Sequence, residues 1–171
     1  VFGFWDIIVD AGHAFATGTK LLTWIDNTAS TTGALFTKAS STANVFTLSL
    51  YQNRLLLGRQ YATTTTNSDL AFYDTDDDSD IPFTSNSGTL QVAAGNELHV
   101  GANVTFAPGG AVTIHGNGAS STQSTDGSFH LDIGSTYTAA ATTTIAGSFT
   151  ASTSVTFTPG NYTLLFNATT T

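Results

Sequence analysis

The chain has 171 residues, only 9% of them charged, and it contains neither cysteine nor methionine. The formal net charge is −8, and the only lysines and arginines are Lys20, Lys38, Arg54 and Arg59. An acidic chain without bases beyond Arg59 repels phosphate, which excludes nucleic acid and anionic membranes as partners. The absence of cysteine excludes disulfides and thiolate metal sites.

The first nine residues, VFGFWDIIV, are a dense apolar strand candidate, far short of the roughly 20 residues that a membrane-spanning helix needs. We therefore expect no membrane insertion. Such a strand either completes its own domain or leaves to complete a neighbour's sheet, since strand donation supplies both ladder hydrogen bonds and side-chain pockets. The residues expected to act in assembly are Val1, Phe2, Phe4, Trp5, Ile7, Ile8 and Val9.

The next apolar segments are short and separated by Thr, Ser and Gly turns, and no window shows helical periodicity. We expect an all-β protein with a larger apolar core in residues 1–85. A polar bridge from about Thr63 to Asp80 leads to a boundary near Ser85, and residues 86–171 form a second, repetitive β region.

Five aspartates lie in the segment YDTDDDSDIP, residues 73–82. Asp74, Asp76, Asp78 and Asp80 alternate, so their carboxylates can converge on one hard cation, and Ca²⁺ accepts six to eight oxygen ligands in flexible geometry. Ser79 stands where an EF-hand needs glycine, so this is no EF-hand. The sequence leaves two interpretations open: a calcium site made by these four residues, or a solvated acidic turn.

The second half alternates apolar and polar residues in short runs bounded by Gly, Pro or Asn, which is typical of half-buried strands. It also repeats itself: VTFAPG at 104–109 recurs as VTFTPG at 155–160, and GSF at 127 recurs at 147. Such repetition favours the stacked coils of a β-solenoid. The alternative is an antiparallel, jelly-roll-like β-sandwich whose hairpins share turn chemistry.

Three histidines, His99, His115 and His130, are almost evenly spaced along the sequence, each between apolar residues of a predicted strand. Coils as long as this spacing would stack them into a ladder that binds a transition metal or responds to pH. The alternative is three unrelated surface histidines. His13 has no visible partner.

The segments GTLQVAAGNELHVGANVTFAPGGAVTIHGN and TTTIAGSFTASTSVTFTPGNYTLLFNATTT resemble the low-charge, Thr/Gly-rich repeat regions of bacterial surface proteins. The nearest group is that of adhesins and autotransporter-like passengers of β-solenoid type. The resemblance implies an exported, non-catalytic role at the cell surface and transfers no functional residue.

The chain lacks the nucleophile, zinc-protease and phosphate-binding motifs. Polysaccharide lyases of parallel β-helix fold are the enzymatic alternative. They need bases that this second half lacks, so we expect no enzyme. The sequence instead predicts an extracellular or cell-surface structural protein, a subunit of a filament, surface layer or adhesin stalk. In this hypothesis copies of the chain assemble by strand donation and are stiffened by calcium. The alternative function is a glycan-binding or adhesive module of a larger surface protein.

Overall fold

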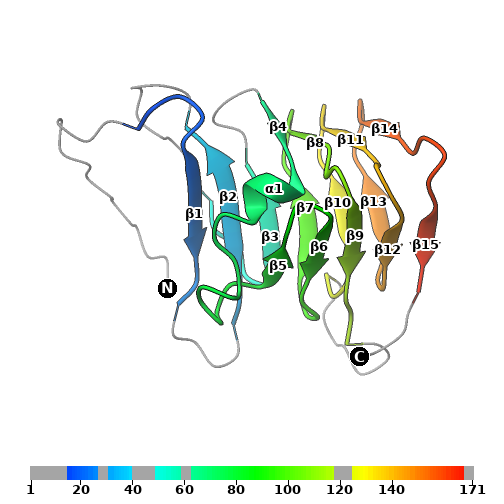
Figure 1. Ribbon diagram of the computed structural model, residues 1–171. Coiled ribbons are helices and arrows are strands. Elements are labelled where there is room, and N and C mark those ends of the chain that lie inside the picture. The colour runs from blue at the N-terminus through cyan, green and yellow to red at the C-terminus, as the bar shows by residue number, and fades with distance from the viewer. Residues whose placement is uncertain (1–14, 27–30, 40–48, 59–62, 118–124, 168–171) are drawn as a thin grey trace.

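The computed structural model describes residues 15–26, 31–39, 49–58, 63–117 and 125–167 (Figure 1). In these ranges the chain is nearly all β, as the sequence predicts, and its strands stack side by side along one axis. The single helix of the described part, α1 (Asn67–Leu70), has four residues. No helix in the described ranges has the length and apolar character needed to cross a bilayer.

The strands form three sheets, named A, B and C here. In spatial order, sheet A contains β1 (Lys20–Trp24), β2 (Ala34–Lys38), β3 (Arg54–Leu57), β7 (Glu97–Val100), β10 (Phe129–Leu131) and β13 (Phe149–Ala151). Sheet B contains β14 (Thr156–Thr158), β11 (Thr136–Thr138), β8 (Thr105–Phe106) and β4 (Thr64–Thr65). Sheet C contains β15 (Leu164–Phe166), β12 (Thr143–Ile145), β9 (Ala111–Ile114), β6 (Thr89–Val92) and β5 (Phe83–Ser85).

The chain visits the sheets in the order A, B, C and then starts again, so that β7–β8–β9, β10–β11–β12 and β13–β14–β15 are successive coils. Equivalent strands pair in parallel: Phe129 lies beside Phe149 of the next coil, and Thr105 and Thr156 share one column through Thr136. The members of the GSF repeat are therefore one coil apart, and those of the VTFAPG repeat are two coils apart. The solenoid prediction is confirmed, and the sandwich alternative is wrong because the coils stack by parallel pairing.

Inward-facing side chains of successive coils form continuous apolar columns. On sheet A, Leu55, Leu98, Phe129 and Phe149 occupy one column. The first three are fully buried. Period-2 alternation sends every second residue inward, so a short strand such as β7 or β10 contributes two core side chains. Burying each of these large apolar side chains contributes roughly 1.5–3 kcal/mol of transfer free energy.

One polar pair lies inside this core. Tyr137 of β11 and Thr143 of β12 are both buried, and their hydroxyl groups form a hydrogen bond with each other. Burial raises the pKa of Tyr137 to about 12, against the smaller lowering effect of the hydrogen bond with Thr143. In the next coil, Phe157 and Leu164 take the places of Tyr137 and Thr143.

The corner between sheets A and B repeats the same backbone conformation in three coils. Asn103, Gly134 and Ser154 each follow a sheet A strand at the same distance, and each has a positive φ, of 58°, 68° and 61°. Asparagine and glycine tolerate this left-handed region better than most residues. A Cβ on Gly134 would also lie 2.5 Å from the Asn103 side-chain oxygen. The turn chemistry of the chain thus sets where each coil bends.

The N-terminal end of the stack is closed differently from its body. β1 pairs with β2 and β5 pairs with β6 in antiparallel fashion, so sheets A and C both finish on an antiparallel strand. α1 lies beside β5 (Figure 1). Sheet A joins strands on both sides of Ser85, since β3 pairs with β7. Sheet C also contains strands from both sides of this position, since β5, which ends at Ser85, pairs with β6.

Candidate functional site

A column of side chains on the outer face of sheet A contains two stacked histidines. Leu98 and Val100 face the core, so His99 between them faces outward. The parallel register places His130 beside His99, and Thr150 beside His130. The two imidazole rings stack with centroids 4.5 Å apart and planes 30° from parallel. His130 Nδ1 lies 2.7 Å from the Thr150 hydroxyl.

Carboxylates and one guanidinium surround this histidine pair. Glu97 Oε1 lies 2.9 Å from His99 Nδ1 and 3.0 Å from Arg54 Nε, so it pairs with both. On the other side, Asp132 Oδ2 lies 3.8 Å from His99 Nε2. His99 thus sits between two acids, and Arg54 balances one of them. We name the set Arg54, Glu97, His99, His130 and Asp132 the sheet A polar cluster.

The pKa of His130 lies below the usual value for histidine. Partial burial lowers the pKa of His130 and the neighbouring His99 lowers it further, while Glu97 and Asp132 act in the opposite direction without overcoming this. At neutral pH the His130 ring is therefore neutral and can donate one hydrogen bond and accept another. The cluster therefore presents both hydrogen-bond donors and hydrogen-bond acceptors on the outer face of sheet A.

An exposed aromatic ring borders the polar cluster. The Arg54 guanidinium carbon lies 5.0 Å from the centre of the Tyr51 ring. Tyr51 is 48% exposed, so much of its surface remains open to solvent. A ring beside fixed polar groups offers a stacking surface together with hydrogen-bond partners.

His99 and His130 stack as the ladder interpretation expects, His115 does not join them, and metal binding stays a prediction. One full coil separates His99 from His130, so the coil is about twice as long as the histidine spacing suggested. His115 follows β9 on sheet C, away from the pair on sheet A. The sequence did not predict Arg54 and Tyr51 as neighbours of His99, because only the coil register brings β3 and β7 together. A signal was available in the alternation of ELHV, which places Glu97 and His99 on the same face.

In the aspartate segment, the carboxylates mostly bind the segment's own backbone. Asp74 is buried, and its two side-chain oxygens accept hydrogen bonds from the N–H groups of Asp76 and Ser85, at 3.0 and 2.6 Å. Asp78 accepts from the N–H of Asp80 at 2.9 Å, and Asp77 accepts from that of Asp74 at 3.1 Å. These bonds hold the segment as an ordered turn against β5.

Two of the four predicted calcium ligands converge with a residue that follows β1. Oxygens of Asp78, Asp80 and Asp26 lie within 4.8 Å of one another. Asp74 and Asp76 are not members of this group. Asp26 follows β1, so sequence spacing offered no signal for its approach. Calcium binding stays a prediction, with Asp26, Asp78 and Asp80 as the carboxylates that are close enough to share one ion.

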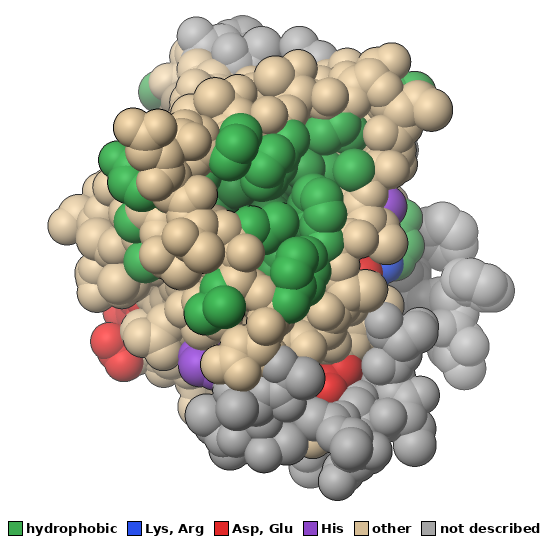
Figure 2. Space-filling view, turned by 90° about the vertical axis from the view of Figure 1, so that its right-hand side faces the viewer, with side chains coloured by type: hydrophobic (Ala, Val, Ile, Leu, Met, Phe, Trp, Pro, Cys, Tyr) green, Lys and Arg blue, Asp and Glu red, His purple; other side chains and the backbone are tan. Residues whose placement is uncertain are grey.

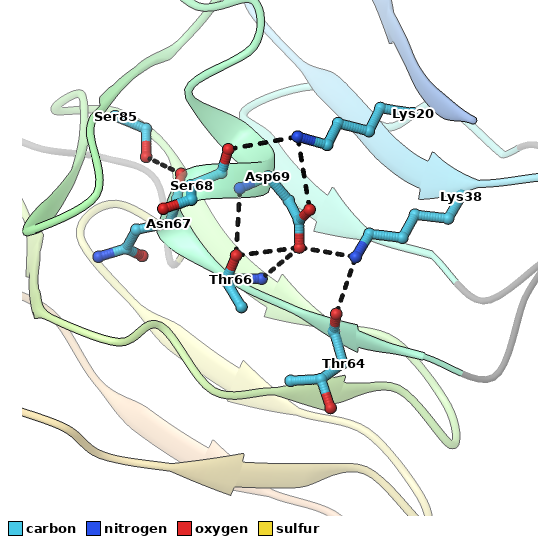
Figure 3. A network of polar contacts seen from close by, with 8 residues as sticks. All are labelled: Lys20, Lys38, Thr64, Thr66, Asn67, Ser68, Asp69 and Ser85. Carbon is cyan, nitrogen blue, oxygen red and sulfur yellow. Dashed lines mark hydrogen bonds and ion pairs between the residues drawn. The ribbon is translucent and has the colours of Figure 1, made fainter. Parts of the chain in front are cut away.

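A third polar network ties α1 to sheet A (Figure 3). Lys38 Nζ lies 2.6 Å from Asp69 Oδ2, and Lys20 Nζ lies 3.5 Å from the other oxygen. Thr66 caps the helix: its hydroxyl accepts from the Asp69 N–H, and Asp69 accepts in return from the Thr66 N–H. Burial alone would raise the pKa of Asp69, but the hydrogen bonds from Lys38 and Thr66 outweigh it and lower the pKa. This network supports the fold, since all its members bind one another.

The expected assembly residues Val1 to Val9, together with His13 and Arg59, lie outside the described residues. No family model, no curated protein and no solved structure matches the chain.

Proposed function

We propose that the chain is a non-catalytic structural protein of the cell exterior, one solenoid unit of a surface filament, surface layer or adhesin stalk. The observation that carries the proposal is the continuous coil stack, in which columns of apolar side chains run from Leu55 to Phe149 across parallel strands. Neighbouring coils support one another along one axis, so the fold forms a stiff rod element. The Thr-rich composition, with only 9% charged residues, agrees with this role.

The proposal is tested by two measurements on the purified chain. We expect the stack to resist a broad-specificity protease under native conditions while the urea-unfolded chain is digested. We also expect no release of reducing or unsaturated sugars from neutral and acidic polysaccharides. Sugar release that is lost in the Glu97→Gln variant would contradict the structural proposal and establish an enzymatic activity. Digestion of the native chain as fast as the unfolded chain would contradict the proposal that the coil stack is a stiff rod.

The sheet A polar cluster favours a second candidate function, a glycan-binding module. Tyr51 offers a ring face, and Arg54, Glu97 and His99 beside it offer fixed donors and acceptors, which is the combination that sugar recognition uses. A sugar-array screen separates the two functions. Binding that Tyr51→Ala abolishes would support the module. Tyr162→Ala is a matched control, because Tyr162 is similarly exposed, at 50%, in the last coil.

Calcium is the stiffening element in the proposed structural role. Asp26 comes from the end of β1, whereas Asp78 and Asp80 belong to the turn before β5. An ion held by these three carboxylates would tie the N-terminal end of sheet A to that of sheet C. Ca²⁺ suits such a site because its coordination tolerates irregular oxygen geometry.

A further inference from the structure

The last described coil, residues 149–167, presents an apolar face at this end of the stack, named the end face here. Figure 2 looks onto this end and shows hydrophobic side chains gathered across its middle. Phe166 occupies the same inward column as Ile145, yet Ile145 is fully buried and Phe166 is 57% exposed. Phe149, Val155, Phe157 and Leu164 are also only partly buried.

The end face also carries the free edges of three strands. β13, β14 and β15 are the final strands of sheets A, B and C, and among the described residues each is paired on one side only. Unpaired edges beside an apolar surface are a template for another chain, and solenoids normally cover such ends. At its other end this stack finishes sheets A and C with antiparallel strands.

We propose that the end face binds the end face of a second copy of this chain, forming a two-fold symmetric, tail-to-tail dimer. A two-fold axis perpendicular to the stack sets β13 antiparallel to β13 of the other copy. The same rotation exchanges sheets B and C, which sets β14 of each copy antiparallel to β15 of the other. All three edges are then paired, and the two apolar faces cover each other in an isologous contact.

Charge favours a second copy at this end. From Ile133 onward the sequence contains no Asp, Glu, Lys or Arg, whereas the chain as a whole has a net charge of −8. The net negative charge opposes contacts between two copies through their acidic regions, but not through their end faces, which carry no charged residue. The described acidic turn with Asp74 and Asp80 lies near β5, toward the opposite end of the stack (Figure 1).

The size of the end face suits a dimer contact at the lower end of the usual range. Stable interfaces use roughly 20–30 residues from each partner. Residues 149–167 form the whole last coil and provide nearly that number. The inference goes beyond the proposed function, because it depends on the end face alone.

The first test is the mass of the chain in solution. Light scattering should give twice the 17.7 kDa of the single chain. Phe166→Asp, which places a charge on the end face in the sheet C column of Ile145, should return the mass to that of one chain. Phe72→Asp is the matched control, since Phe72 is 41% exposed beside α1 and should leave the dimer intact. A single-chain mass for the unaltered protein, or association that Phe166→Asp leaves unchanged, would overturn the dimer.

The second test reports on the arrangement and uses the absence of cysteine. Thr150 lies in the middle of β13 and is exposed, so Thr150→Cys places thiols near the two-fold axis. Under mild oxidation this variant should form a disulfide-linked dimer, because a disulfide requires Cα atoms within about 7 Å. Ser68→Cys, on α1, should not cross-link. Equal cross-linking of both variants, or of neither, would refute the tail-to-tail contact, while a monomer would leave the structural role of the coil stack untouched.

Discussion

The buried pair of Tyr137 and Thr143 allows the packing argument to be tested quantitatively. Tyr137→Phe removes the phenol oxygen and leaves the Thr143 hydroxyl buried without its partner. A buried polar group left unpaired costs about 1–3 kcal/mol. Thr143→Val leaves the Tyr137 hydroxyl unpaired and should cost a similar amount.

The double variant, Tyr137→Phe with Thr143→Val, should be far less destabilised than the two single variants together. It removes both polar atoms at once, so no buried group lacks a partner, and we expect a net cost below about 1 kcal/mol. One coil later, the chain has two apolar side chains at the equivalent positions, Phe157 and Leu164.

Urea unfolding followed by tryptophan fluorescence and circular dichroism measures these differences. For a chain of this size each kcal/mol corresponds to about 2–4 °C in Tm. The denaturant slope should stay constant across the four proteins, which checks that the same surface unfolds. Additive single costs in the double variant would refute the argument, because they would show that the two hydroxyl groups are not coupled.

Alkaline pH gives an independent test of the same pair. The pKa of Tyr137 is raised to about 12 in the folded chain. The folded state therefore keeps its proton after the unfolded state begins to lose it. The contribution of Tyr137 to stability is complete below about pH 10 and is lost as the pH rises toward 12. Tyr137→Phe should flatten this decline.

Three other predictions follow from the polar contacts. Thr66→Ala removes the cap of α1 and should lower the unfolding free energy by about 0.5–2 kcal/mol in urea melts, whereas Thr66→Ser keeps the hydroxyl and should lose little. Because the pKa of His130 is lowered, its contribution is present above about pH 6.5 and is lost as the pH falls. His130→Gln should therefore reduce the loss of Tm between about pH 7 and 5, and an unchanged profile would contradict the assignment. Calcium at millimolar concentration should raise the Tm of the unaltered chain and of Asp76→Asn, but not of Asp78→Asn; equal responses of both variants would exclude the three-carboxylate site.

The sequence predicted the stacked strands because the relevant signals are local. Alternation in segments such as Val112 to Ile114 and turn residues at the corners act within a few positions, and the recurrence of VTFAPG can be seen in the sequence without knowing which residues pair between coils. What could not be predicted depends on the register between coils. The stacking of His99 on His130 requires a long coil, while the following coil, from Phe129 to Phe149, is clearly shorter. Equal histidine spacing suggested a uniform coil that the chain does not have.

The aspartate segment shows the same division between local and distant information. Its acidic composition and its turn character are plain in the sequence, and the turn is formed. Which carboxylates meet is decided elsewhere, because Asp74 binds the Ser85 N–H and Asp26 approaches from β1. Only the tertiary structure determines which carboxylate oxygens accept hydrogen bonds from the backbone and which lie close to one another.

The direction of the ladder hydrogen bonds has a mechanical consequence. In the last three coils these bonds run along the stack axis, since each strand pairs with the strand directly above or below it. Each coil lengthens the rod by only about 4.8 Å. Under tension along the axis, the bonds of one coil are loaded together and open before those of the next. The coil from Phe129 to Phe149, once opened, would release roughly 65–70 Å of extended chain. Such a rod would yield stepwise under a pull and dissipate energy at each step, as an extensible tether does.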